Sequence, residues 1–205
     1  MSGIPPGRNQ EPPATTGRRK KMTWTLDPHH TSVSFSAKHL GVATVRGSFN
    51  HVEADLDLDD PADPTTGRGR VVIDASSIDT GDERRDGHLR NADFFDADTY
   101  PQLVFEVKSV RPARDDTYTV VGELTIKDVT REITLDYEHN GSVVDPMGNV
   151  KVGGTLSGSI NRSDWGLTWN VPLAGGRWLV SDTVKLEIDG ELTQVKMQAR
   201  EDVAA

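Results

Sequence analysis

Residues 32–58, SVSFSAKHLGVATVRGSFNHVEADLDL, alternate apolar and polar side chains with a period of two. This period is typical of a β-strand that buries one face. The apolar side chains occupy odd positions from Val33 to Phe49 and even positions from Val52 to Leu58. A phase shift inside one run indicates a β-bulge or a sharp bend, and Gly47 would help to form one. The stretch therefore predicts strands at 32–39, 45–51 and 52–59.

The same alternation recurs along the chain, and turn-rich segments such as DDPADPTTGRG at 59–69 separate the runs. Further strands are predicted at Arg70–Ala75, Leu103–Arg111, Tyr118–Lys127, Glu132–Glu138, Lys151–Ile160 and Thr183–Gln194. Only Asp82–Phe95 has helical spacing, which predicts one or two short helical turns inserted between strands. Eight or more strands with one insertion predict an all-β fold, either an antiparallel barrel or a sandwich.

Large aromatic side chains bear on the choice between these two folds. A barrel of about eight strands either fills its interior with side chains or holds one small ligand. The aromatic residues are too dispersed to belong to one hairpin, so some must face the interior: Phe35, Phe49, Phe94, Phe95, Phe105, Trp165, Trp169 and Trp178. From the pattern alone, a packed sandwich core and a ligand-holding lumen remain equally open.

Length and composition indicate one soluble domain. The chain has 205 residues, of which 35% are hydrophobic and 27% are charged; these values are typical of a globular protein with a real core. Residues 1–21 are rich in proline, glycine and basic residues, and we expect them to form a disordered N-terminal tail. The predicted domain is 22–196, and 197–205 form a C-terminal tail.

The charge is unevenly distributed. The formal net charge is −9, but residues 1–21 carry five basic residues and one acidic residue, which leaves −13 for the remainder. An acidic domain argues against nucleic-acid binding, because phosphate contacts need a basic face. The run GRRKK at 17–21 allows a peripheral contact with an anionic lipid surface, although a solvated tail is the simpler interpretation.

The chain contains no cysteine, which excludes disulfides, thiol catalysis and a cysteine-based zinc site. No run approaches the ~20 apolar residues of a membrane span. The first residues contain no apolar segment resembling a secretory signal, so we expect a cytoplasmic localisation.

Motifs for catalysis or cofactor binding are missing. The sequence has no GxSxG elbow, phosphate-binding loop, GxGxxG turn or HExxH helix. His29, His30, His39, His51 and His88 could converge on a metal, but isolated histidines are more often structural. We therefore predict no catalytic residue, no metal site and no cofactor. One enzymatic alternative stays open, in which Asp86 and His88 act as an acid/base pair on a small hydrophobic substrate.

Four ordered segments resemble the YceI family, also called polyisoprenoid-binding or lipid-binding YceI-like proteins. The segments are TWTLDPHHTSVSFSAKHLGVATVRGSF at 23–49, IDTGDERRDGHLRNADFFDADTYP at 78–101, VGELTIKDVTR at 121–131 and INRSDWG at 160–166. The resemblance covers Trp24–Leu192. The opening departs slightly, because His29-His30-Thr31 stands where the family has a single histidine followed by serine.

The resemblance implies an extended, lipocalin-like antiparallel β-barrel of about eight strands. It also implies a lumen that binds an amphiphile with a long isoprenoid or acyl chain, such as a polyprenyl phosphate or isoprenoid quinone, for storage or transport. Family members are often dimers, so a homodimer is expected. The alternative is a ligand-free structural or stress-response protein with a fully packed interior.

Two groups of side chains are predicted to contact such a ligand. The lumen wall is assigned to Phe35, Ala37, Phe49, Phe105, Leu124, Ile126, Trp165 and Leu186, and the Phe94–Phe95 pair is expected to contact the lipid tail. Among polar residues, His39, His88 and Arg162 are candidates for the head group, since a guanidinium can bind phosphate or carboxylate bidentately. The competing interpretation is a polar network in which Arg85, Asp86 and His88 fasten the helical insertion to the barrel end.

Overall fold

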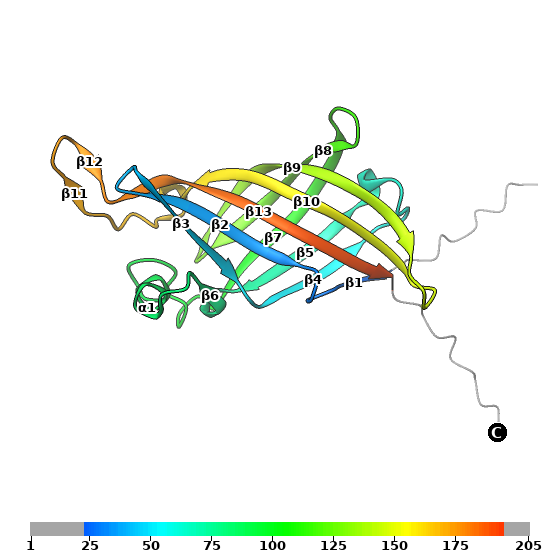
Figure 1. The fold of residues 1–205 in the computed structure, drawn as a ribbon, viewed down its shortest axis with the longest axis horizontal. Helices are drawn as coiled ribbons and strands as arrows, with labels where there is room; N and C mark the ends of the chain where they lie inside the picture. The colour runs from blue at the N-terminus through cyan, green and yellow to red at the C-terminus, as the bar shows by residue number, and fades with distance from the viewer. Residues whose placement is uncertain (1–22, 195–205) are drawn as a thin grey trace, which may run out of the picture.

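A closed eight-stranded antiparallel β-barrel forms the body of the protein in a computed structural model that describes residues 23–194 (Figure 1). The ring closes because β1 pairs with β4 on one side and with β13 on the other. This confirms the predicted all-β barrel and rejects the sandwich. In ring order the strands are β1 (Thr23–Leu26), β4 (Val52–Asp57), β5 (Arg68–Asp74), β7 (Gln102–Pro112), β8 (Thr117–Ile126), β9 (Val129–Val144), β10 (Val150–Asn161) and β13 (Val180–Gln194).

Three more strands extend the wall at one end of the barrel. The long strand β13 pairs with β1 through Leu192–Gln194 and with β2 (Ser32–His39) through its earlier residues. Strand β2 then pairs with β3 (Ala43–Phe49), and β3 pairs with the short β6 (Ile78–Asp79). Only two residues separate β3 from β4. The predicted phase shift therefore marks a real bend, after which the chain pairs with different neighbours.

The helical insertion lies against this extended end. It comprises η2 (Ala75–Ser77), β6 and α1 (Glu83–Arg90), which is the short helix expected between 82 and 95. Asp82 caps the helix by accepting bonds from the backbone of Arg84 and Arg85. Asp86 is buried and accepts a 3.0 Å bond from the backbone N–H of Thr80. These bonds tie α1 to the segment that follows β6, and the pairing of β6 with β3 joins the insertion to the wall.

The two ends of the barrel differ, and we call them the mouth and the far end. The mouth carries α1, the turn between β2 and β3, and a hairpin of β11 (Pro172–Leu173) and β12 (Arg177–Trp178) (Figure 1). At the far end Trp24, Leu58 and Val152 form a small core, in which the indole of Trp24 donates a 2.9 Å bond to the carbonyl of Leu58. The short helices η1 (Pro64–Thr66) and η3 (Arg162–Trp165) complete the fold.

Most of the strands predicted from periodicity are present with similar bounds. Strand β9 is longer than predicted, and β1, β6, β11 and β12, each of two to four residues, were not predicted. The predicted tails at 1–21 and 197–205 lie outside the described residues. Within residues 23–194, no helix is long and apolar enough to cross a membrane.

Candidate functional site

The barrel encloses an apolar cavity of about 210 Å³ just inside the mouth. Its lining consists of apolar side chains apart from Ser34 and Arg162. The structure thus brings together ten of the predicted site residues around one lumen: Phe35, Ala37, Phe49, Phe94, Phe95, Phe105, Leu124, Ile126, Arg162 and Leu186. These residues come from β2, β3, β7, β8, η3, β13 and the segment after α1, which are far apart in the sequence.

Glycines on the neighbouring strands let aromatic rings lie flat against the inner wall. The ring of Phe35 lies where a Cβ on Gly47 would be, within 2.5 Å, and the ring of Phe105 lies within 2.4 Å of the same position on Gly122. Such distances are shorter than any real contact, so only glycine is accommodated there. Gly47 was expected to support a bend, but its role in the structure is to make room for Phe35.

A second compartment of about 170 Å³ lies at the far end of the barrel and shares no lining residue with the first cavity. Along β9, Leu135 lines the first cavity and the next inward residue, Tyr137, lines the second. The Tyr137 hydroxyl lies 3.2 Å from Nδ1 of His139, and its ring packs on Gly154. Burial raises the pKa of Tyr137 to about 12, so the phenol stays neutral near pH 7. Asp57, Arg68 and His139 also line this compartment, so the far end of the barrel is more polar than the first cavity.

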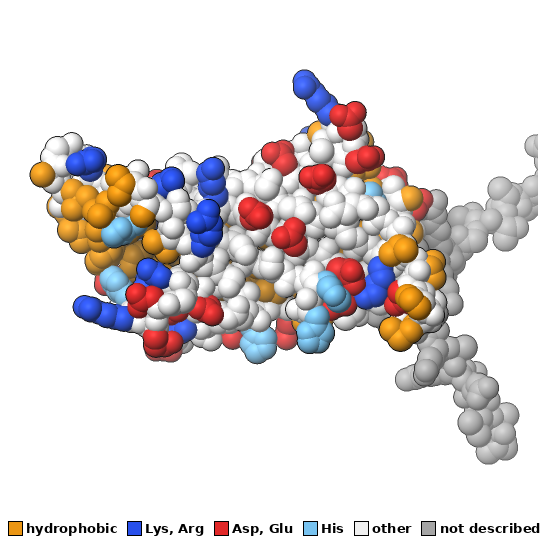
Figure 2. All heavy atoms as spheres, viewed as in Figure 1, with side chains coloured by type: hydrophobic (Ala, Val, Ile, Leu, Met, Phe, Trp, Pro, Cys, Tyr) orange, Lys and Arg blue, Asp and Glu red, His pale blue; other side chains and the backbone are white. Residues whose placement is uncertain are grey.

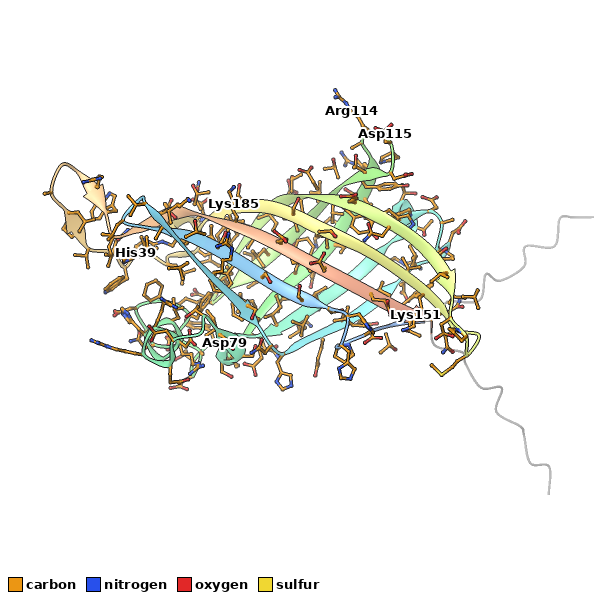
Figure 3. The ribbon with its side chains drawn as sticks, in the orientation of Figure 1. His39, Asp79, Arg114, Asp115, Lys151 and Lys185 are labelled. Atoms are coloured by element: carbon orange, nitrogen blue, oxygen red, sulfur yellow. The ribbon has the colours of Figure 1, made fainter. Side chains whose placement is uncertain are left out.

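At the mouth, a more open cavity of about 640 Å³ adjoins the lumen. It shares Phe35, Ala37 and Phe94 with the lumen lining and adds polar side chains, including the predicted residues His39 and His88. His39 lies at the mouth and Lys151 at the opposite end (Figure 3). The transition from apolar lumen to polar mouth matches the two halves of an amphiphile.

His88 is held in place by both a carboxylate and aromatic rings. Its Nε2 lies 2.9 Å from Oδ2 of Asp93, and its ring meets those of Phe94 and Trp169 edge-on at 5.1 and 4.6 Å. Asp86, the proposed acid/base partner, instead accepts bonds from Thr80. The two residues therefore have different partners, which does not favour the enzymatic alternative.

Arg162 reaches the lumen lining, but its guanidinium is engaged by backbone carbonyls. Nε donates to Ser181 at 3.1 Å, and Nη1 donates to Trp169 at 3.0 Å and also to Leu167. Burial lowers the pKa of Arg162 from its usual value. These bonds hold the loop after β10 against β13, so the geometry supports a structural role rather than the expected head-group contact.

Trp165 is the one predicted wall residue that lies outside every cavity described above. Its side chain is 2% exposed, and its indole donates a 3.0 Å bond to the carbonyl of Leu124. It packs in the main hydrophobic core, in the same cluster as Leu124. A large aromatic side chain predicts a buried position. The sequence does not distinguish a residue that is packed in the core from one that lines the lumen.

Several lining residues were not singled out by the sequence. They lie at inward positions on β5, β9, β10 and β13 and could have been found from the period of two: Val71, Ile73, Leu135, Ile160, Val184 and Ile188. Tyr137 and His139 had no such signal, because a polar side chain at an inward position looks like an error in the pattern.

In the described part of the chain, Asp27, His30 and Glu191 lie close enough to share one metal ion. The ammonium of Lys151 is already there, 3.1 Å from Asp27 and 2.7 Å from Glu191. Hydrogen bonds from His30 and then from Lys151 hold the pKa of Asp27 well below its usual value. Lys151 supplies the positive charge that a metal would bring, so the cluster is an ion-pair network joining β10, β13 and the segment after β1.

Comparison with known proteins identifies the family. The model of the YceI-like domain matches residues 24–192. A UPF0312 protein of Staphylococcus aureus strain N315 is 38% identical over 171 residues, which cover 83% of this chain and 96% of that protein. The crystal structure of the Campylobacter jejuni YceI protein is 32% identical, with a TM-score of 0.68 over 78% of this chain and 90% of that one.

A more distant structure shares the fold. It is a polyisoprenoid binding domain from Saccharophagus degradans implicated in plant cell wall breakdown, 17% identical, with a TM-score of 0.61 over 85% of this chain and all of that one. The resemblance seen in the four sequence segments is thus confirmed over nearly all the described residues, and the chain belongs to the YceI family.

Proposed function

We propose that this protein binds an amphiphilic lipid, an isoprenoid such as a polyprenyl phosphate or an isoprenoid quinone, in its lumen for storage or transport. The observation that carries this proposal is the closed barrel around an apolar cavity that opens into a polar mouth. An apolar cavity of ~150 Å³ already takes up benzene in other proteins. The lumen cavity is larger than that, and a second compartment of about 170 Å³ lies beyond it along β9.

The distribution of side chains sets the orientation of the ligand. The hydrocarbon chain lies in the lumen, where each buried methylene contributes ~0.8 kcal/mol before the cost of ordering the chain. The head group stays at the mouth, where the cavity lining includes His39, His88 and the exposed Arg84. A chain that fills the first cavity extends past Leu135 towards Tyr137.

The name of the Saccharophagus degradans structure supports an isoprenoid chain, since that protein is described as a polyisoprenoid binding domain. A bound lipid explains why apolar side chains line a space that the chain itself leaves unfilled.

The test is the identity of what the protein carries. We expect native mass spectrometry of gently purified protein to show an adduct, and lipid extraction to identify a prenyl chain. Delipidated protein should then take up prenyl alcohols, with affinity rising with chain length until the lumen is full. Protein recovered without lipid that also takes up no prenyl chain of any length would contradict the proposal.

A further inference from the structure

One side of the barrel mouth has an apolar rim. Large hydrophobic side chains are exposed there on two neighbouring segments, the β2–β3 turn and the β11–β12 hairpin: Leu40, Val42, Val171 and Trp178. Val42 is 78% exposed and Trp178 is 57% exposed. Figure 2 shows hydrophobic side chains gathered at this end of the molecule. We call these four residues the mouth rim.

The mouth rim is continuous with the path into the lumen. Leu40 and Trp178 line a hollow of about 440 Å³ that also contacts Val180. Val180 in turn lines both the mouth cavity and the lumen cavity. Val180 therefore links the hollow beneath the rim to the mouth cavity and to the lumen, although polar side chains also line that hollow.

Hydrogen bonds fix the mouth rim in its exposed position. The N–H of Leu40 donates a 2.8 Å bond to Leu179, whose own N–H donates a 3.0 Å bond to Val171. The β2–β3 turn is thereby tied to the hairpin. Leu40 has a φ of 57°, in the left-handed region that a leucine rarely adopts. Gly41 follows with a φ of 75°, and the N–H of Val42 donates a 3.1 Å bond to the carbonyl of His39, so Leu40 and Gly41 form the tight turn that joins β2 to β3.

Positive charge lies beside the mouth rim in an otherwise acidic protein. Lys38 and Arg177 line the same hollow, and Arg84 and Arg85 line the adjoining mouth cavity. The acidic group in the hollow, Asp182, accepts bonds from the backbone and hydroxyl of Ser163. The acidic group in the mouth cavity is the helix cap described above.

We propose that the mouth rim docks on the surface of an anionic lipid bilayer, with the mouth facing the membrane. Trp178 and the aliphatic side chains would insert at the level of the head groups, a position that tryptophan favours. Lys38, Arg84 and Arg177 would meet the anionic head groups. If the lumen holds a lipid, as proposed above, this orientation lets the chain pass between bilayer and barrel without crossing water.

The far end supplies a matched control. Val143, Val144 and Met147 are also exposed hydrophobic residues, but they belong to the β9–β10 hairpin, where Asp145 lies between them. An apolar surface alone would bind a membrane at either end. Docking through the mouth requires that changes at the mouth rim reduce binding and that changes at the far end do not.

The experiment measures sedimentation of the full chain with vesicles of phosphatidylcholine containing phosphatidylglycerol, and with phosphatidylcholine alone. Wild-type protein should bind the anionic vesicles more tightly, and added salt should weaken binding. The double variant V42D/W178D should lose roughly tenfold or more in affinity, whereas V143D/M147D should bind like wild type. The basic run at 17–21 is present in every variant, so its attraction to lipid is common to all.

Two further measurements separate this proposal from lipid binding in the lumen. Uptake of a prenyl alcohol from detergent solution should be the same for V42D/W178D and wild type, which also shows that the variant is folded. Brominated lipid should quench Trp178 fluorescence, as judged against W178F. Equal vesicle binding by V42D/W178D and wild type would overturn the proposal. So would a dimer of the wild-type chain that V42D/W178D abolishes in solution without affecting vesicle binding.

Discussion

Replacing Ala37 with phenylalanine should fill the lumen from its own wall and separate lipid binding from folding. Ala37 lies on β2 between Val184 of β13 and Val45 of β3, and its side chain lines both the lumen and the mouth cavity. The added ring is about the size of benzene, which needs ~150 Å³. It would therefore take up most of the 210 Å³ lumen cavity.

The expected magnitudes follow from that volume. Cavities destabilise proteins by about 24 cal/mol per Å³, so filling ~150 Å³ stabilises the barrel by at most ~3–4 kcal/mol. Strain from the larger side chain offsets about 1–3 kcal/mol of this. We expect a net gain of ~1–2 kcal/mol and a Tm higher by ~2–8 °C. A ring that displaces about four methylenes of a ligand should weaken its binding by ~3 kcal/mol, roughly 100-fold.

The assay combines thermal unfolding of delipidated protein with titration of a fluorescent prenyl probe. Ser36→Phe is the matched control, because it adds the same ring to the outer face of the same strand, where Ser36 lines a hollow outside the barrel. The control should retain probe binding and gain no stability from cavity filling.

A folded Ala37→Phe protein that binds the probe as tightly as wild type would refute the assignment of the lumen as the binding site. A second outcome is a variant that is destabilised by more than the strain expected from overpacking and still excludes the probe. This result would show that the cavity is too rigid to accept the ring.

Three other changes test the structure that supports the site. Gly154→Ala should lower the free energy of unfolding in urea by ~1–3 kcal/mol, because the added Cβ would lie 2.3 Å from the ring of Tyr137. Gly153→Ala should be nearly neutral, because its Cβ would have its nearest contact at 3.8 Å. Asp86→Ala should lower the free energy of unfolding by ~2–4 kcal/mol, because a buried acceptor of two hydrogen bonds is lost. Amide hydrogens of α1 should then exchange faster, whereas Asp98→Ala, at an exposed position, should change little. Because the pKa of Asp27 is lowered in the folded state, its stabilising effect is present above about pH 4 and is lost as the pH falls towards the folded pKa. Asp27→Asn should therefore flatten the acid side of the stability–pH curve relative to wild type.

Periodicity alone predicted the long strands and the bend, because alternation over seven or more residues has few other causes. The alternation at 33–37 placed Val33, Phe35 and Ala37 on one face, and that face lines the lumen. Strands such as β1 and β12 escaped prediction because two to four residues hold too little pattern. Their pairing is supplied by distant partners, as in the contact of Trp24 with Gln194.

The candidate site was predictable only in part, for a related reason. An inward apolar residue carries the same pattern whether it packs in the core or lines a cavity, so Trp165 and Phe49 could not be told apart. Arg162 looked like a phosphate ligand in INRSDWG because a sequence does not show which donors the backbone already occupies. The polar far end at Tyr137 and His139 appeared only once the strands were paired.

The sequence by itself determined that this is an all-β protein with one helical insertion, and its four motifs indicated the family. These properties depend on local alternation and on short ordered segments. Whether the interior is solid or hollow, which end opens, and which charges are engaged were decided only by the tertiary structure. The physical reason is that closing the barrel joins the short β1 to β13, more than 160 residues away along the chain. The enclosed volume depends on how rings such as Phe35 and Phe105 lie against glycines of neighbouring strands.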